Sequence, residues 1–198
     1  MEFTAKDVAK LREETGAGFA DCKNALATAK SFDEAIKLIE EKGQQRAEKV
    51  KGQDRETRQG LVESYIHHGG NLGVLLELNC STDFVARSDT FRTLARELTL
   101  QIAGTNPTWV AMSDVPESTM AEAREKLMND PEVLKRPENK REQIVEGKLK
   151  KQFGEHVLLE QIWVKDDKVT IGKLVNDVIR KTGENVVVRR FARFALGE

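Results

Sequence analysis

Residues 60–87 read GLVESYIHHGGNLGVLLELNCSTDFVAR, and this stretch decides the fold. Two runs rich in Val, Leu, Ile and Tyr flank the turn-forming sequence Gly69-Gly70-Asn71. We therefore expect an antiparallel hairpin with strands over residues 60–68 and 72–79. The first strand should pack through three residues: Val62, Tyr65 and Ile66. A helix should follow, because apolar residues then recur on one helical stripe: Phe91, Leu94, Ala95, Leu98 and Ile102.

The sequence beyond this helix mixes helical and extended patterns. Helices are predicted over residues 120–128 and 138–152 and after a capping Thr170, and extended segments over residues 157–164 and 186–194. Because helices and strands do not alternate strictly, the pattern favours an α+β domain with a small antiparallel sheet packed with helices. We assign this core domain to residues 59–198.

The residues before the hairpin predict a separate head of three short helices, residues 1–44. Capping pairs start the first and third helices: Thr4 with Asp7, and Ser31 with Glu34. Gly43 is expected to end the third helix. A core of this size leaves little room for an enclosed catalytic pocket, so the pattern is typical of a docking module.

Two phenylalanines allow either a packing role or a binding role. Phe19 follows the Gly16-Ala17-Gly18 turn, where it can fill the small core or stand exposed as an apolar anchor. Phe84 follows Asp83 between a strand and a helix, where turn residues are expected. The pair can be a helix cap with a hydrophobic staple, or an acid and an apolar wedge directed at a partner. Residue type alone favours packing at both places.

Residues 45–58 predict a charged connector between the two domains. They contain almost nothing to bury, which is typical of a solvated helix extension or a flexible linker. A nucleic-acid-binding arm is disfavoured, because acidic residues are interspersed and no aromatic side chain is present for bases to stack on.

Composition excludes several classes of protein. The 198 residues carry 32 Lys and Arg against 33 Asp and Glu, so we expect no nucleic-acid partner and no anionic membrane surface. No run approaches the roughly 18 apolar residues of a membrane span, and the N-terminus lacks an apolar signal core. Two cysteines are too few for a disulfide scaffold or a four-cysteine zinc site. We expect a soluble cytoplasmic protein.

The strongest candidate for an enzyme site is Cys80 with Asp83 and the neighbouring His67 and His68. A thiol beside an imidazole can form a nucleophile, and these residue types also bind zinc. However, Cys80 ends an apolar strand, where a buried and inert thiol is the more common outcome. No phosphate-binding loop, dinucleotide-binding motif or metalloprotease motif is present. We therefore expect no catalytic residue, no bound metal and no cofactor.

Two long motifs resemble the signatures of bacterial elongation factor Ts. The first is LREETGAGFADCKNAL at residues 11–26, and the second is NCSTDFVAR at residues 79–87. Further similarity at residues 65–69, at residues 146–151 and in the C-terminal strand extends the resemblance over essentially the whole chain. The resemblance implies a ubiquitin-associated-like three-helix domain followed by an α+β core, in agreement with the pattern analysis.

The resemblance implies a guanine-nucleotide exchange factor in translation, and not an enzyme with covalent chemistry. Such a factor binds elongation factor Tu carrying GDP, loosens the nucleotide and its magnesium, and holds the nucleotide-free form until GTP enters.

The motif positions imply roles for individual residues. Arg12, Phe19 and Ala20 match the head positions that dock on the partner's nucleotide domain. His67 matches a histidine of the core that contacts the partner. One segment matches the part that intrudes near the magnesium site: Thr82, Asp83, Phe84 and Val85. The resemblance thus favours the binding role for Asp83 and Phe84.

The chain resembles the short members of the family, because it has one hairpin and one Thr-Asp-Phe-Val sequence. Short members form homodimers, which implies a complex of two copies with two copies of elongation factor Tu. Ala192 occupies the place of a cysteine that links some of these dimers. We therefore expect the dimer to rest on packing, through the strand edge over residues 186–194.

Overall fold

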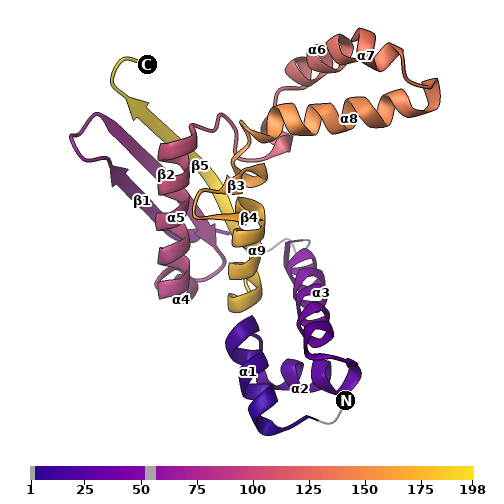
Figure 1. Ribbon diagram of the computed structural model, residues 1–198. Coiled ribbons are helices and arrows are strands. Elements are labelled where there is room, and N and C mark those ends of the chain that lie inside the picture. The colour runs from indigo at the N-terminus through magenta and orange to yellow at the C-terminus, as the bar shows by residue number, and fades with distance from the viewer. Residues whose placement is uncertain (1–2, 52–56) are drawn as a thin grey trace. The chain divides into compact units, whose positions relative to one another are not determined.

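The computed structural model describes residues 3–51 and 57–198 (Figure 1). The chain divides into two units, which we describe separately. The first unit comprises Met1–Gly60, Asn79–Phe91 and Val175–Val187, and the second comprises Leu61–Leu78, Arg92–Leu174 and Val188–Glu198. Helices and strands do not alternate strictly, and the predicted α+β class is confirmed.

The predicted head of three helices is present in the first unit. The helices are α1 (Ala5–Thr15), α2 (Phe19–Thr28) and α3 (Phe32–Lys51). Their shared core consists of small and medium apolar side chains: Val8, Leu11, Cys22, Ala25, Leu26, Ala29, Ala35 and Ile39. Phe19 is 58% exposed, so the interpretation of this residue as a core plug is wrong.

The predicted caps are formed. Thr4 accepts a hydrogen bond from the backbone N–H of Asp7, and the Asp7 carboxylate accepts one from the backbone N–H of Thr4 at 2.7 Å. The hydrogen bond from the Thr4 N–H to the carboxylate holds the pKa of Asp7 below its usual value. At α3, the backbone N–H of Glu34 donates to Ser31 at 3.1 Å. Local capping chemistry therefore sets where both helices begin.

The expectation that Gly43 ends the third helix is wrong, because α3 continues to Lys51. An interior glycine costs a helix about 1 kcal/mol relative to alanine. The residues that follow include Gln, Arg, Ala, Glu and Lys, which are good helix formers and offset that cost. The helix thus takes up the first part of the predicted connector, and residues 52–56 of the connector lie outside the described residues.

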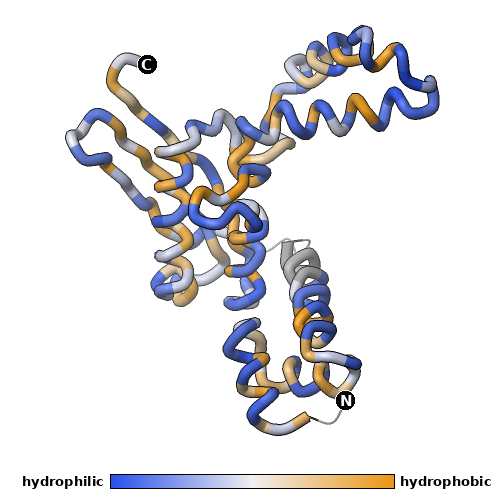
Figure 2. The backbone as a smooth tube through the Cα atoms, in the orientation of Figure 1, coloured by the Kyte–Doolittle hydropathy of each residue, from blue (hydrophilic) through white to orange (hydrophobic). Residues whose placement is uncertain are grey.

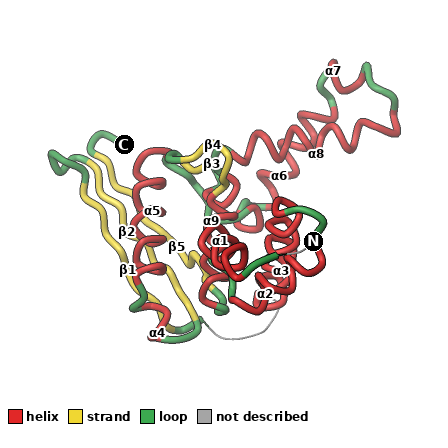
Figure 3. The backbone as a smooth tube through the Cα atoms, turned by 60° about the horizontal axis from the view of Figure 1, so that its bottom comes forward, coloured by secondary structure: helices red, strands yellow, loops and turns green. Residues whose placement is uncertain are grey.

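The predicted hairpin is formed by β1 (Gln59–Ile66) and β2 (Leu72–Cys80). Its turn uses positive φ angles at Gly69 and Gly70, which only glycine adopts at little cost. The strand β5 (Val186–Ala195) lies beside β2, so the order of the small antiparallel sheet is β1-β2-β5 (Figure 3).

One face of the sheet is buried. Alternate residues of β2 are nearly inaccessible: Val74, Leu76, Leu78 and Cys80. The helix α5 (Asp89–Thr105) lies along this sheet (Figures 1 and 3). It buries every residue of its predicted stripe, including Phe91 and Leu98 with no exposed surface. The central strand and this helix therefore provide the main apolar core.

The opposite face of the sheet remains exposed, which corrects the expected packing of β1. Val62 is 68% exposed and Ile66 is 67% exposed, whereas Tyr65 is half-buried. Side chains alternate between the two faces of a strand, so Val62 and Tyr65 cannot point to the same side. The residues of β1 that approach the core are those of odd number, and Val62 and Ile66 belong to the other set.

A helical arm in the second unit has its own core. It consists of α6 (Glu117–Met128), α7 (Pro131–Leu134) and α8 (Glu138–Gly154). Its buried residues form one cluster: Val115, Ala123, Val133, Val145, Leu149, Phe153 and Val157. Figure 2 shows that hydrophilic residues dominate the rest of α8. The short turn η1 (Met112–Asp114) precedes the arm.

The segment after the arm differs from the extended strand expected over residues 157–164. It forms the turn η2 (Leu158–Glu160) and a two-stranded sheet of β3 (Ile162–Trp163) and β4 (Asp166–Thr170). The buried side chain of Gln101 donates to the carbonyl of Ile162 at 3.0 Å and accepts from the N–H of Val164 at 3.0 Å. This pairing joins α5 to β3. Thr170 then caps α9 (Ile171–Thr182), as predicted.

The structure predicts that Leu26→Ala destabilises the head strongly. Leu26 is completely buried, so its truncation should lower the free energy of unfolding by about 2–5 kcal/mol. Phe19→Ala is the control, and it should change this free energy by no more than about 0.5 kcal/mol. Urea titration followed by circular dichroism measures both values. Equal losses in the two variants would contradict the assignment of the head core.

Candidate partner-binding surface

The short helix α4 (Asp83–Ala86) presents an exposed phenylalanine directly after β2. Thr82 caps it by accepting a hydrogen bond from the N–H of Val85 at 3.3 Å. Val85 and Ala86 are buried, whereas Phe84 is 82% exposed. We call residues 82–85 the tip. A packed staple requires a covered Phe84, so the exposure favours the alternative of an apolar wedge.

Asp83 forms an ion pair with Arg87 one helical turn later. The distance from the Arg87 guanidinium to the Asp83 carboxylate is 3.2 Å, and both side chains are largely exposed. Surface pairs of this kind contribute about 0–1 kcal/mol to stability. The Asp83 carboxylate can therefore leave Arg87 and pair with a polar group of another molecule at little cost in free energy.

Glu184 is a residue of this surface that the sequence did not indicate. It follows α9, and its carboxylate accepts hydrogen bonds from the backbone N–H of Thr82 at 3.0 Å and from the Thr82 hydroxyl at 2.7 Å. The two residues are 102 positions apart. No local pattern could have paired them, because nothing in the residues around Glu184 distinguishes it from other surface glutamates.

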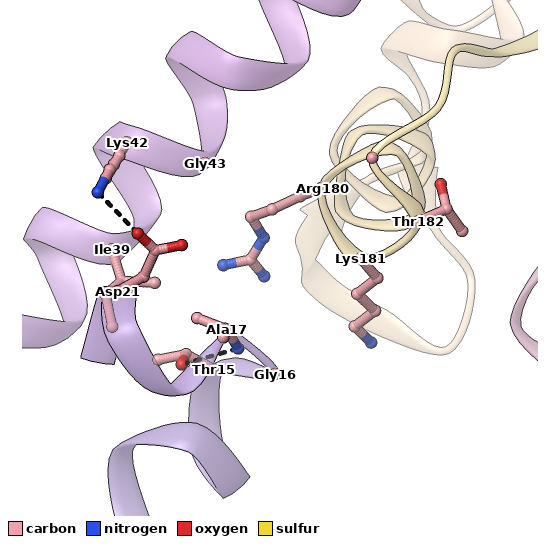
Figure 4. A pocket seen from close by; sticks show the side chains of 12 residues that line it. Thr15, Gly16, Ala17, Asp21, Ile39, Lys42, Gly43, Arg180, Lys181 and Thr182 are labelled. Atoms are coloured by element: carbon pink, nitrogen blue, oxygen red, sulfur yellow. Dashed lines mark hydrogen bonds and ion pairs between the residues drawn. The ribbon is translucent and has the colours of Figure 1, made fainter. Parts of the chain in front are cut away.

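The predicted head residues lie around the turn between α1 and α2. Arg12 lies in the last turn of α1, Phe19 and Ala20 begin α2, and all three are exposed. Gly16 has a φ of 65° and permits the sharp change of direction. Two interactions brace this region, as Figure 4 shows: Thr15 accepts from the N–H of Ala17 at 3.3 Å, and Lys42 pairs with Asp21 at 2.7 Å.

His67 lies at the end of the hairpin in the second unit. Its Nδ1 is 2.7 Å from the Tyr65 hydroxyl, and their ring centroids are 6.0 Å apart. The histidine is exposed, so this contact orients the ring without covering it.

Cys80 has the properties of a structural thiol. It is completely buried, and its Sγ donates to the carbonyl of Thr82 at 3.1 Å. Burial raises the pKa of this thiol, and the negative charge of Glu184 raises it further. A nucleophilic cysteine requires the opposite shift, because the thiolate is the reactive form.

The described residues contain no group of three or more His, Cys, Asp and Glu side chains arranged to hold a metal ion. Of the helices in the same part of the chain, none is both long and apolar enough to cross a membrane.

An exposed aromatic on a short capped helix and a second one on a small helical head are typical of proteins that bind a macromolecular partner. The chain belongs to a family of this class. Residues 2–198 match the family described as Elongation factor TS, and the resemblance found in the sequence is confirmed.

Full-length relatives agree with this assignment. Elongation factor Ts of Coprothermobacter proteolyticus is 48% identical over 199 residues, which cover all of both chains. That of Desulfosudis oleivorans is 45% identical over 197 residues, covering 99% of this chain and 98% of the relative. That of Rippkaea orientalis is 45% identical over all of this chain and 79% of its own length.

The raised pKa and burial of Cys80 predict slow alkylation. In a Cys22→Ala variant, the rate with iodoacetamide at pH 8 should be at least about tenfold lower for the folded chain than for the chain in urea. The pKa in the folded state exceeds that in the unfolded state. The contribution of this thiol to stability is therefore complete below the unfolded pKa and is lost as the pH rises through the folded pKa. Equal alkylation rates would indicate an accessible, reactive thiol.

Proposed function

We propose that this chain is a guanine-nucleotide exchange factor that binds elongation factor Tu carrying GDP and promotes GDP release until GTP binds. The observation that carries the proposal is the placement of Phe84, which is 82% exposed on a helix anchored by the buried Val85. Membership of the elongation factor Ts family supports the identity of the partner. A cytoplasmic location is part of the proposal, and the proposed role in translation supports it.

The proposed activity requires differential binding and no general acid or base. The factor must bind the nucleotide-free partner tightly and the GDP-bound partner weakly. This coupling is reciprocal, so nucleotide binding expels the factor by as much as the factor weakens the nucleotide. Each 1.4 kcal/mol corresponds to about a tenfold change in affinity. A few contacts of roughly 2–4 kcal/mol each can therefore offset a change of several powers of ten in nucleotide affinity.

The tip is the proposed active part of this surface. Magnesium requires near-ideal octahedral coordination, so a small displacement of the groups around it weakens its binding sharply. Phe84 offers a rigid apolar wedge, and Asp83 offers a negative charge beside it. Thr82 and Val85 hold these two residues in place through the cap. We infer that the tip disturbs the groups that support the partner's magnesium and phosphates.

The head and the hairpin are proposed to provide further contacts. Phe19, Arg12 and Ala20 form an exposed group at one end of the head, where an aromatic and a guanidinium are the residue types that most often dominate binding energy. His67, braced by Tyr65, is proposed to contact elongation factor Tu from the core.

A homodimer is proposed to form through the exposed face of the three-stranded sheet. Val62, Ile66, Leu75 and Phe194 are between 48% and 71% exposed, and they come from all three strands. The Glu77–Arg190 pair, at 2.6 Å, accompanies them. Large apolar side chains that gather on an exposed surface are typical of an interaction site. The proposed contact is thus broader than the β5 edge, and with two bound partners it gives a two-plus-two complex.

Phe84→Ala is predicted to lower the rate of GDP release by roughly 30-fold, the loss expected for a hot-spot contact of about 2 kcal/mol. The measurement is release of labelled GDP from elongation factor Tu with the chain added in substoichiometric amounts. Leu134→Ala removes another exposed side chain, on the helical arm, and should leave the rate unchanged. Full activity of a folded Phe84→Ala chain would exclude the wedge.

Leu75→Glu is predicted to separate the dimer into single chains. Leu75 lies on the central strand, so the substitution places an unpaired carboxylate in the middle of the proposed interface. Sedimentation velocity should show the mass of two chains for the unmodified protein and of one chain for the variant. Leu134→Glu is the matched control and should remain dimeric. A monomeric unmodified chain at micromolar concentration would contradict the proposal.

A further inference from the structure

A carboxylate that lies outside residues 79–91 in the sequence is hydrogen-bonded to the tip. Glu184 accepts from the backbone N–H of Thr82 at 3.0 Å through one oxygen and from the Thr82 hydroxyl at 2.7 Å through the other. Both donors belong to the residue that immediately precedes α4. Hydrogen bonds to an ionised acceptor are roughly twice as strong as bonds between neutral groups.

The chain conformation places Glu184 in this position. The helix α9 ends at Thr182, and the N–H of Gly183 donates to the carbonyl of Ile179 at 2.8 Å. Gly183 has a φ of 72°, a conformation that an L side chain adopts only at a cost. The N–H of Glu184 then donates to the Thr182 hydroxyl at 3.4 Å. The carboxylate is thus attached to the end of a packed helix and not to a free loop.

The Thr82 hydroxyl depends on Glu184 for its orientation. A hydroxyl has one hydrogen to donate and lone pairs with which to accept. With its hydrogen directed at Glu184, the Thr82 oxygen presents a lone pair to the N–H of Val85 at 3.3 Å. The Thr82 carbonyl is also engaged, by the Cys80 thiol at 3.1 Å and the N–H of Ala86 at 3.2 Å. Glu184 therefore completes a network that fixes all the polar groups of Thr82.

We propose that Glu184 is a positioning residue for nucleotide exchange: it preorganises the tip so that Phe84 meets the partner in its binding orientation. The inference rests on the exchange function proposed above. Ordering a loop at the moment of binding costs free energy, and a surface that is already ordered avoids that cost. Both Glu184 oxygens are occupied by Thr82 and the side chain is half-buried, so its role is to hold the tip and not to touch the partner.

The first test measures the order of the tip in the isolated chain. Amide hydrogen exchange followed by NMR should be about tenfold faster at Val85 and Ala86 in Glu184→Ala than in the unmodified chain. Asp177→Ala is the control, because Asp177 is a carboxylate of the same unit that pairs with Arg180 and not with the tip. The control should leave these amides unchanged. Unchanged protection of the tip in Glu184→Ala would overturn the proposal whatever the chain does to elongation factor Tu.

The second test uses GDP release in two backgrounds. Glu184→Ala should raise the concentration of the chain needed for half-maximal exchange by about tenfold. In a Phe84→Ala background the same substitution should change it less than twofold, because no wedge remains to be positioned. A general loss of stability would act equally in both backgrounds. Equal effects would therefore overturn the positioning role.

A further variant, Glu184→Gln, tests whether the negative charge of Glu184 contributes to the hydrogen bonds with Thr82. Glu184→Gln keeps one carbonyl acceptor for the Thr82 N–H but loses the charge, so its effect should lie between those of the unmodified chain and Glu184→Ala. If Glu184→Gln is as impaired as Glu184→Ala, the proposed division of the two Glu184 oxygens between the N–H and the hydroxyl of Thr82 is wrong. If the unmodified chain does not accelerate GDP release while Glu184→Ala still loosens the tip, the exchange function fails and the preorganisation of the tip stands.

Discussion

The burial of alternate residues along β2 is the constraint on which the rest of the structure depends. Val74, Leu76, Leu78 and Cys80 share one face, and the stripe of α5 covers the sheet from that side. The last of these residues, Cys80, is completely buried, and the tip begins two residues later at Thr82. The tip therefore follows directly after a buried strand, which suits the proposed wedge because a binding residue is placed more precisely on a packed element than on a loop.

In this arrangement, the residues that anchor the helix and the residue proposed to bind the partner are neighbours in the chain. Within α4, Val85 and Ala86 are buried and Phe84 is exposed, so the same short helix is packed on one side and accessible on the other. Phe19 of the head is likewise mostly exposed, and it does not belong to the buried core of the three helices. An exposed aromatic side chain costs solubility and gives no folding energy. The exposure of Phe84 and Phe19 on packed helices therefore agrees with the proposed partner binding.

The helical arm and the sheet show how the fold distributes its apolar surface. The arm buries most of its large apolar side chains in one cluster, together with Val115 and Val157 from the segments that flank it. The sheet does not, because Val62, Ile66 and Phe194 remain on an open face. The contrast agrees with the proposal that a second chain covers this face of the sheet.

The sequence by itself determined the helices of the head, the hairpin and the stripe of α5, because caps, turns and side-chain periodicity act over four residues or fewer. Its two long motifs also determined the family. Only the tertiary structure decided that Val62 and Phe19 are exposed and that Glu184 holds Thr82 from 102 positions away. These outcomes depend on which surfaces meet, and contacts between distant segments leave no local pattern in the chain.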